Sequence, residues 1–495
     1  MTKRISLLLL ISFFISVCLA QQKKKNIIFI LSDDHRYDFM GFMNAVPGLQ
    51  TPGMDRMAKE GAHIKNAFVT TSLCSPSRAS ILTGQYAHTH TVVDNSAPLP
   101  NNLTFFPQYL QKNGYKTAFM GKWHMGNTGD APQPGFDQWI SFEGQGLYYG
   151  NTLNVNGKRE KLDSNNYITD ELTGRAIGWM SSVKNNPFCL YLSHKGVHAE
   201  FMPAKRHAGK YKNLPVISPQ SMYLTVTDSS KQFGVVSPPK TPVNYKDIPR
   251  WVREQRYSWH GVDYMYHGQI PFDEFYHLYL ETLQSVDESI QQVMDWVEKS
   301  GLADNTIIVY MGDNGFLFGE HGLIDKRNAY EESMRVPMLI WAPGFAKPNS
   351  VVTQMILNID LAPTFLDIAG IARPSQMQGQ SFLPLLKGEK SAWRDKVFYE
   401  YYWEQAFPQT PTTFAVRTDK YKYISYYGIW DINELYDLEN DPYEMNNLIR
   451  NKDMDKIGLQ LRDELNNWLE KTNGFQIPLK KQQGRKNDNL YRNTY

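Results

Sequence analysis

Residues 26–34 read NIIFILSDD, an apolar run that is followed by two aspartates. The same arrangement, an apolar stretch of strand length that ends in polar residues, returns at 115–120, 188–193 and 306–311. Helical patterns separate these stretches, and such alternation is typical of an α/β fold with a largely parallel sheet. Ligands of these sheets bind beyond the carboxyl ends of the strands. We therefore expect the polar residues after the stretches to meet at one edge of the sheet.

Helix signals fall between the predicted strands. Thr51 and Pro52 mark the start of a helix that Gly61 ends, and the longest predicted helix spans about 277–300. Residues from about 213 to 272 are rich in proline, tyrosine and tryptophan and show no clear period. A long irregular insertion is often functional, so this one is interpreted either as a wall over a site or as a simple surface cover. In the first case its candidate carbohydrate contacts are Trp251, Arg253, Arg256 and Trp259.

A second, smaller unit is predicted to begin near residue 393. Its expected elements are antiparallel strands at 414–423 and 434–438 and a helix at about 453–471. The chain is thus divided into a catalytic domain at 21–392, a C-terminal subdomain at 393–477 and a polar tail at 478–495. The predicted fold class is α/β, with a large, mostly parallel sheet between helices and a smaller C-terminal α+β subdomain.

The first twenty residues have the pattern of an export signal. Two basic residues precede an apolar run at 5–14, and the small-x-small pattern of Cys18-Leu19-Ala20 follows. The run is short for a membrane span, so we predict a signal peptide at 1–20 and no transmembrane segment. The protein is expected to be exported, to a periplasm or outside the cell. Lipid anchoring through Cys18 is the less favoured alternative, because Val17 before it is bulky for that processing.

Composition and cysteine content narrow the class of protein. Hydrophobic residues make up 42% of the 495 residues, enough for a large core, and the net charge of +2 does not indicate a nucleic-acid binder. Without the predicted signal only Cys74 and Cys189 remain, so no disulfide framework holds the fold. Cys189 lies in a strand-like run and is expected to be a buried apolar residue. A bond between the two cysteines stays open, and it would block the chemistry considered below for Cys74.

A cysteine segment lies between two sets of oxygen ligands. Residues 74–79 read CSPSRA, which alone could be a free cysteine ahead of a helix. Asp33 and Asp34 follow one predicted strand, and Asp313 and Asn314 follow another. Carboxylate and amide oxygens are the ligands of Ca²⁺ or Mg²⁺ rather than of zinc. Either pair alone could cap a helix or a turn, but both pairs at strand ends beside the cysteine segment favour a metal site.

Basic residues occupy equivalent positions after the predicted strands. Lys122 and His124 end one strand, His194 and His198 follow another, and Lys326 comes shortly after Asp313. Each alone could be a solvated or structurally hydrogen-bonded side chain. Their shared position at strand ends favours a single cationic site.

These motifs resemble the type I, formylglycine-dependent sulfatases of the alkaline phosphatase superfamily. The likeness runs from about residue 26 to 448 and includes CSPSRASILTG at 74–84, GDNG at 312–315, and Lys326 with the residues that follow it to Pro337. It implies that a maturation enzyme oxidises Cys74 to formylglycine during synthesis. The hydrated aldehyde is a diol, one hydroxyl of which attacks the sulfur of a sulfate ester. Collapse of the diol back to the aldehyde then expels sulfate.

The resemblance also implies a role for each site residue. One Ca²⁺ ion would be bound by Asp33, Asp34, Asp313, Asn314 and the converted Cys74. Arg78 would hold the formylglycine hydrate, Lys122 and Lys326 would hold the sulfate oxygens, and His124 would assist the elimination of sulfate. His198 is predicted to protonate the departing sugar oxygen, with His194 as the competing assignment. Cations and a proton donor at that oxygen stabilise the charge that develops as its bond to sulfur breaks.

The substrate is predicted from shorter likenesses. The stretch YAHTHTVVDN at 86–95 is similar to N-acetylglucosamine-6-sulfatases, which act on glycosaminoglycan and mucin glycans, whereas 191–207 is similar to bacterial relatives of iduronate-2-sulfatases. We therefore expect a sulfated carbohydrate substrate, with 6-O-sulfated N-acetylglucosamine as the predicted sugar and an iduronate-2-sulfatase-like or other sulfatase specificity as the alternative. Candidate sugar contacts are His90, Asn95 and Arg36, for each of which a structural hydrogen-bonding role is the competing interpretation.

Two other classes of function are considered. The superfamily includes phosphatases and phosphonate hydrolases, against which the CSPSR segment and the single predicted metal set argue. A non-catalytic glycan-binding protein is the third possibility. It is disfavoured because it would gain nothing from a costly buried set of charges.

Overall fold

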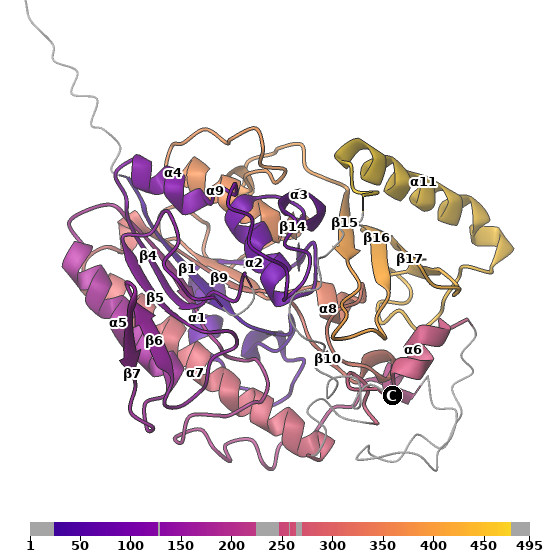
Figure 1. Ribbon diagram of the computed structural model, residues 1–495, viewed down its shortest axis with the longest axis horizontal. Helices are drawn as coiled ribbons and strands as arrows, with labels where there is room; N and C mark the ends of the chain where they lie inside the picture. The colour runs from indigo at the N-terminus through magenta and orange to yellow at the C-terminus, as the bar shows by residue number, and fades with distance from the viewer. Residues whose placement is uncertain (1–23, 127–128, 224–246, 257, 264–269, 477–495) are drawn as a thin grey trace, which may run out of the picture.

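The computed structural model describes residues 24–126, 129–223, 247–256, 258–263 and 270–476 (Figure 1). The predicted signal peptide at 1–20 and the tail at 478–495 lie outside these residues, as does part of the irregular stretch. Within the described part, no helix is both long enough and apolar enough to span a membrane.

A ten-stranded mixed sheet forms the centre of the larger unit. Its strand order is β13-β2-β12-β9-β1-β8-β4-β5-β6-β7. The bounds are β13 Ser350–Val352, β2 Ala62–Ile64, β12 Met338–Trp341, β9 Thr306–Gly312, β1 Asn26–Ser32, β8 Phe188–Ser193, β4 Lys116–Lys122, β5 Gln138–Phe142, β6 Thr152–Val155 and β7 Lys158–Lys161. The five strands from β9 to β5 are parallel, whereas β12, β6 and β7 pair antiparallel with their neighbours. The predicted mostly parallel sheet is confirmed, with antiparallel strands added outside the parallel block.

Helices cover both faces of this sheet (Figure 1). One layer holds α1 Pro52–Glu60, α5 Ile168–Val183 and α7 Phe272–Lys299; the other holds α2 Cys74–Thr83, α4 Phe106–Lys112 and α9 Leu361–Ile368. Along β1, Ile28 and Ile30 pack in the first layer, while Ile27 and Phe29 pack in the second. A parallel strand that is buried on both faces must be apolar throughout. This is why β1 reads as a continuous apolar run rather than as an alternating one.

The segments around α7 differ from the sequence prediction. The helix begins at Phe272 rather than near 277, because Phe272, Phe275 and Tyr276 extend its buried face by more than a turn. The irregular stretch contains the short helix α6, Arg250–Gln255. Of the carbohydrate contacts considered there, Trp251 packs against Tyr426 and buried Arg256 pairs with Asp263.

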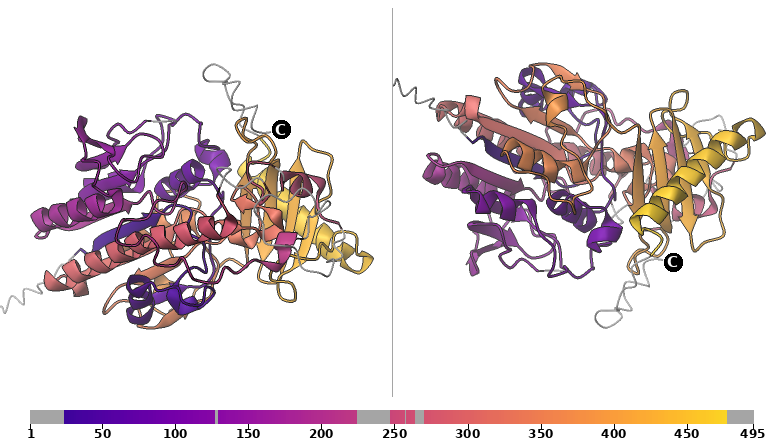
Figure 2. Two further views of the ribbon diagram at one scale, coloured as in Figure 1. Left: turned by 90° about the horizontal axis from the view of Figure 1, so that it is seen from below. Right: turned by 90° about the horizontal axis from the view of Figure 1, so that it is seen from above.

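The C-terminal part is a four-stranded antiparallel sheet with one long helix. The strands are β15 Lys396–Tyr401, β16 Thr412–Thr418, β17 Tyr421–Tyr427 and β18 Glu434–Asp437, in that spatial order. Helix α11, Asp455–Thr472, lies across one face of this sheet and buries Leu461, Leu465 and Leu469 against it (Figure 2). Residues on the opposite face, including Tyr399 and Ile424, pack against the larger unit. The sheet is thereby fixed beside the carboxyl ends of the parallel strands.

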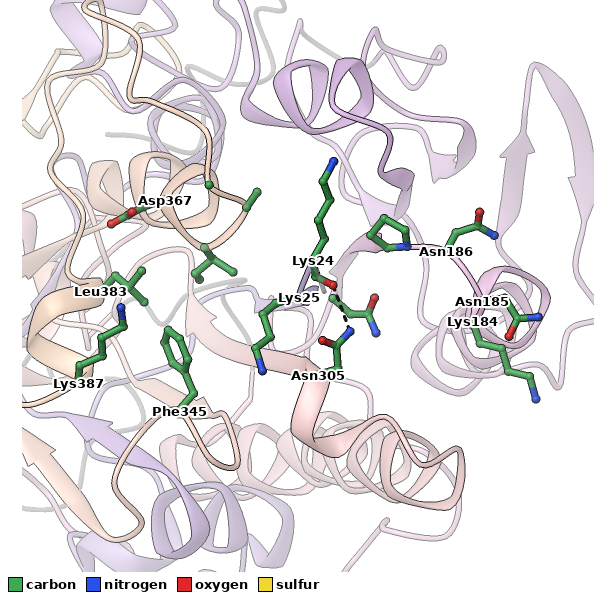
Figure 3. A pocket seen from close by; sticks show the side chains of 15 residues that line it. Lys24, Lys25, Lys184, Asn185, Asn186, Asn305, Phe345, Asp367, Leu383 and Lys387 are labelled. Atoms are coloured by element: carbon green, nitrogen blue, oxygen red, sulfur yellow. Dashed lines mark hydrogen bonds between the residues drawn. The ribbon is translucent and has the colours of Figure 1, made fainter. Parts of the chain in front are cut away.

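A pocket of about 560 Å³ opens at the opposite end of the main sheet, where β1 begins (Figure 3). Lysines line it, including Lys24, Lys25 and Lys387. The ammonium groups of Lys24 and Lys25 donate hydrogen bonds to the backbone carbonyls of Asn113 and Asp304. Because β1 runs from this pocket toward Asp33, the pocket is separate from the site described next.

Candidate active site

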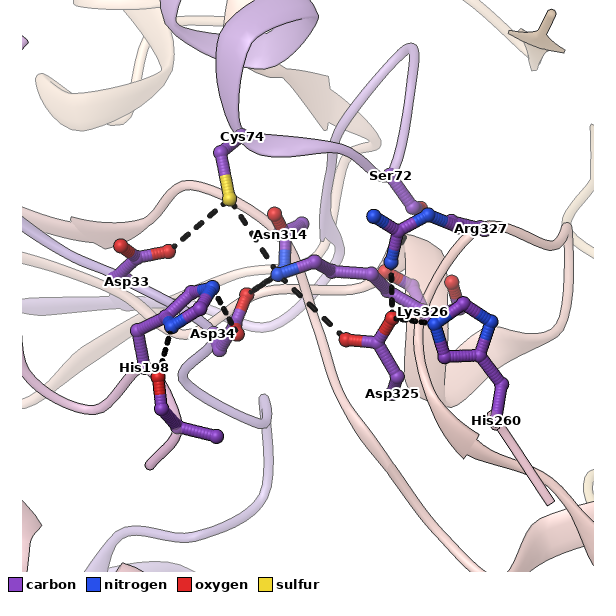
Figure 4. A network of polar contacts seen from close by, with 12 residues as sticks. Asp33, Asp34, Ser72, Cys74, His198, His260, Asn314, Asp325, Lys326 and Arg327 are labelled. Carbon is purple, nitrogen blue, oxygen red and sulfur yellow. Dashed lines mark hydrogen bonds and ion pairs between the residues drawn. The ribbon is translucent and has the colours of Figure 1, made fainter. Parts of the chain in front are cut away.

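The polar residues expected at the strand ends do meet at one edge of the sheet (Figure 4). Asp33 and Asp34 follow β1, Asp313 follows β9, and Cys74 is the first residue of α2. One oxygen or sulfur atom from each of these four residues lies within 4.8 Å of the others. All four side chains are fully buried. The result is a compact group of three carboxylates around one thiol.

Local signals place Cys74 at the start of a buried helix. Pro76 lies in the first turn of α2, and Gly84, with a φ of 67°, ends the helix. Asn95 accepts a hydrogen bond from the backbone N–H of Ser75 at 3.1 Å. Burial raises the pKa of the Cys74 thiol, and Asp33 adds to the increase. The helix N-terminus favours negative charge on whatever group occupies position 74.

The oxygen atoms of the group fit a hard cation. The Oδ2 atom of Asp34 and the Oδ1 atom of Asn314 are buried and have no hydrogen-bond partner among the residues described. The amide of Asn314 donates to Asp34 at 2.7 Å, which fixes the orientation of its free oxygen. Burial raises the pKa of Asp34 to about 7 even though Lys326 opposes the shift. Unpartnered buried oxygens call for a partner, and oxygen ligands of this kind suit Ca²⁺ or Mg²⁺.

Three cations surround the carboxylates. Lys122 donates to Asp33, while Lys326 donates to Asp34 and also lies 3.4 Å from the Cys74 sulfur. The guanidinium of Arg78 lies 2.8 Å from a carboxylate oxygen of Asp313 and donates to the Lys122 carbonyl and the Ser193 hydroxyl. Burial alone would raise the pKa of Asp33, but Lys122, with His198, Arg78 and Lys326, holds it well below its usual value. Asp33 is therefore an anion at neutral pH.

The structure separates the two histidines that compete for the role of proton donor. His198 places its Nε2 atom 3.9 Å from a carboxylate oxygen of Asp34, and a ring nitrogen belongs to the same group as Asp33 and Cys74. His194 instead points to the α7 helix, with its Nε2 atom 3.0 Å from the Ser289 hydroxyl. Burial lowers the pKa of both rings, and Lys122 adds to the effect at His198. His198 alone of the pair is at the cluster.

His124 joins the cluster from the end of β4. Its side chain is buried, and its Nδ1 atom has no hydrogen-bond partner among the described residues. Burial and then Lys122 lower its pKa well below the usual value, so the ring is neutral.

The candidate sugar contacts occupy three different environments. His90 is buried with its Nε2 atom 3.0 Å from the Ser80 hydroxyl, and Arg36 pairs with Asp38 at 2.7 Å and with Glu320. Asn95 contacts the first turn of α2, as described above. All three side chains hydrogen-bond to other residues of the protein. These bonds agree with the structural role that was the competing interpretation for each of them.

The structure adds residues that sequence reasoning did not assign. Asp325 lies 3.7 Å from the ammonium of Lys326 and 3.3 Å from a ring nitrogen of His260 (Figure 4). Arg327 contacts Asp325 and donates to Glu404 at 2.9 Å, which links the site to the C-terminal sheet. The available signal was the sequence Asp325-Lys326-Arg327, in which an aspartate directly precedes two basic residues.

Comparison with known proteins now identifies the family. The family model described as Sulfatase matches residues 25–371. The chain belongs to the sulfatase family. This sulfatase also matches the model described as N-sulphoglucosamine sulphohydrolase, C-terminal, over residues 319–471. The prediction of a sulfuric ester hydrolase is confirmed.

Several relatives of this sulfatase are named as N-acetylglucosamine-6-sulfatases. It is 35% identical over 471 residues to the N-acetylglucosamine-6-O-sulfatase of Bacteroides thetaiotaomicron, with 86% of this chain and 83% of the relative covered. It is 29% identical to the N-acetylglucosamine-6-sulfatase of Homo sapiens, covering 89% and 83%. A solved structure in complex with its substrate D-glucosamine-2-N,6-O-disulfate matches with a TM-score of 0.79 and 31% identity, covering 90% and 98%.

Proposed function

We propose that this sulfatase removes the 6-O-sulfate of N-acetylglucosamine units in sulfated glycans. The reaction type follows from the family and from the cluster of Cys74, Asp33, Asp34 and Asp313. The sugar follows from relatives that carry this specificity in their names at 35% and 29% identity over most of both chains. The likeness to the complex with a 6-O-sulfated glucosamine supports the same choice.

The nucleophile is proposed to come from Cys74, converted to formylglycine by a maturation enzyme. Once oxidised and hydrated, residue 74 supplies a hydroxyl group that attacks sulfur. A Ca²⁺ ion held by Asp33, Asp34, Asp313, Asn314 and residue 74 would draw electron density from a sulfate oxygen. The unpartnered oxygens of Asp34 and Asn314 and the buried carboxylate group support this assignment.

The surrounding side chains can perform the remaining steps. Lys122 and Lys326 bind sulfate oxygens and stabilise the charge that develops on them. Arg78, fixed between Asp313 and the Lys122 carbonyl, orients residue 74. His198 donates a proton to the bridging oxygen as the sugar leaves, and His124 accepts one from residue 74 as sulfate is eliminated. The Asp33 carboxylate opposes the fall in the pKa of His198 and so favours the protonated form of that ring.

We also propose that the protein is exported from the cytoplasm. The charged and apolar pattern of residues 1–20 supports a signal peptide and a periplasmic or extracellular location. Sulfated glycans are extracellular polymers, so the enzyme and its substrate would meet outside the cytoplasm.

The experiment is a sulfate-release assay with the matured enzyme. We expect release from N-acetylglucosamine-6-sulfate, weak release from its 3-sulfate isomer and from 2-sulfated uronic acid disaccharides, and none with Cys74→Ala. Cys189→Ala is the matched control, because Cys189 is a buried apolar residue within β8, and it should retain activity. Preferential release from the 2-sulfated uronic acid would show that the proposed sugar is wrong. Activity in Cys74→Ala would show that the proposed nucleophile is wrong.

A further inference from the structure

Lys195 is a buried lysine to which the proposed reaction gives no role. It follows β8, between His194 and His198, and only 4% of its surface is exposed. Its ammonium lies 4.7 Å from the centre of the Tyr148 ring. In the part of the chain that the structure describes, no oxygen atom accepts a hydrogen bond from this ammonium and no carboxylate lies within ion-pair distance. Lys122 and Lys326, by contrast, each pair with an aspartate.

The position of Lys195 is tied to that of His198. The backbone N–H of His198 donates to the Lys195 carbonyl at 3.0 Å, so both residues belong to one tight turn. The hydroxyl of Tyr148 donates to the His198 carbonyl at 2.6 Å, while the face of the same ring contacts the Lys195 ammonium. Tyr148 thus holds the Lys195 ammonium near His198, and the charge of Lys195 acts on the His198 ring.

The electrostatic environment of Lys195 favours an anion beside its ammonium. A buried ammonium without a counterion is unfavourable, and contact with one aromatic face offsets only part of that cost. Burial lowers the pKa of Lys195 to about 8, and Lys122 contributes to the decrease, whereas Asp33, Asp34 and Cys74 oppose it. An anion that entered beside Lys195 would interact with it in a medium of low dielectric constant, where the attraction is strong.

We infer that Lys195 binds a sulfo group of the substrate, in addition to the contacts made by Lys122 and Lys326. This inference rests on the proposed function of the same site. The sulfo group is either the ester that is hydrolysed or a second one on the sugar. Both candidates are sulfo groups, so Lys195 would bind either one in the same way. They differ in which substrates should bind more weakly when Lys195 is replaced.

The test compares Lys195→Met and Lys195→Arg with the wild-type enzyme. Methionine keeps the length and the apolar contact with Tyr148 but removes the charge, whereas arginine restores the charge. Lys205→Met is the matched control, because Lys205 is an exposed lysine further along the same segment, and its ammonium donates a hydrogen bond to Asn165. The substrates are N-acetylglucosamine-6-sulfate and glucosamine-2-N,6-O-disulfate, and calorimetry measures the binding of inorganic sulfate. We expect Lys195→Met to raise KM about tenfold for at least one substrate, as for a lost hydrogen bond to a charged group. Lys195→Arg should recover part of the loss, and Lys205→Met should change neither value.

Each outcome has a defined meaning. Equal losses on both sugars with weaker binding of inorganic sulfate identify the reacting ester as the partner. A loss confined to the disulfate, with inorganic sulfate binding unchanged, identifies the second sulfo group. Unchanged KM and unchanged sulfate binding in Lys195→Met would overturn the inference. A fall in melting temperature that matches the fall in activity would also overturn it, because removal of a buried unpaired charge should not destabilise the fold. If the wild-type enzyme releases sulfate from neither sugar, the proposed substrate is wrong, and sulfate binding by Lys195→Met alone decides the role of Lys195.

Discussion

Replacement of His198 by glutamine tests the proposed proton donor. Glutamine can still hydrogen-bond but cannot donate a proton to the departing oxygen. Positioned acid catalysis contributes about 10²–10⁴-fold to a rate, which corresponds to about 3–5 kcal/mol of activation free energy. The ring is buried beside Asp34, with its Nε2 atom 3.9 Å away, so no water molecule takes its place easily. We therefore expect kcat on N-acetylglucosamine-6-sulfate to fall within that range.

The leaving group makes this prediction specific. A sugar alkoxide must be protonated as it departs, whereas the phenolate of a nitrophenyl sulfate leaves without a proton. The loss in His198→Gln should therefore be at least tenfold smaller on the aryl sulfate, which is about 1.4 kcal/mol. Steady-state kinetics on both substrates, with sulfate measured directly, gives the comparison. His194→Gln is the control, because His194 faces Ser289 on α7, and its kcat should stay close to that of the wild-type enzyme. An equal loss on both substrates, or a larger loss in His194→Gln, would refute the assignment.

Three further predictions concern stability. Removal of Ca²⁺ with a chelator should lower the melting temperature and abolish sulfate release. A ligand at a thousand times its Kd stabilises a fold by about 4 kcal/mol, which is lost when the ion is removed. Equal melting curves with and without chelator would contradict the metal site. Lys422→Met should lower the free energy of unfolding in urea by about 3–5 kcal/mol, because Lys422 is buried between Glu331 and Glu444 at 2.9 and 2.7 Å. Lys420→Met, which removes the exposed Lys420–Glu439 pair, should lower it far less. Similar decreases in the free energy of unfolding of the two variants would show that burial of the ion pair does not determine its contribution to stability. The pKa of Asp287 is raised by burial to about 7, so the folded state binds this proton more tightly than the unfolded state. The contribution of Asp287 to stability is then full below about pH 4 and is lost as the pH rises to about 7. Between pH 5 and pH 8 the free energy of unfolding should therefore fall less in Asp287→Asn than in the wild-type enzyme. The same pH dependence in both proteins would contradict this prediction.

Much of the catalytic edge could be predicted from the sequence because it depends on local patterns. The apolar run of β1 fixes the position of Asp33 and Asp34, and the corresponding run of β9 fixes that of Asp313. Since parallel strands end at the same edge of a sheet, their convergence follows without knowledge of any side-chain contact. The assignment of Cys74 to the same edge needed the family resemblance, because a cysteine ahead of a helix has no distinctive pattern of its own.

The choice of His198 over His194 rested on the family resemblance, because local sequence patterns do not separate the two residues. Both follow β8, four residues apart, and the tight turn at 195–198 decides which ring faces the carboxylates. The start of α7 was also misplaced, because Phe275 in its first turn is buried by contacts with the distant residues Phe316 and Phe318 rather than by local periodicity. The same limit applies to Arg327, whose partner Glu404 lies 77 residues further along the chain.

The fraction of residue 74 present as formylglycine, measured by mass spectrometry and plotted against sulfate release, tests the central claim most directly. Preparations made with increasing amounts of the maturation enzyme should release sulfate from N-acetylglucosamine-6-sulfate in proportion to that fraction. Protein that retains an unmodified Cys74 should be inactive. Full activity from protein whose residue 74 is still cysteine would contradict the account.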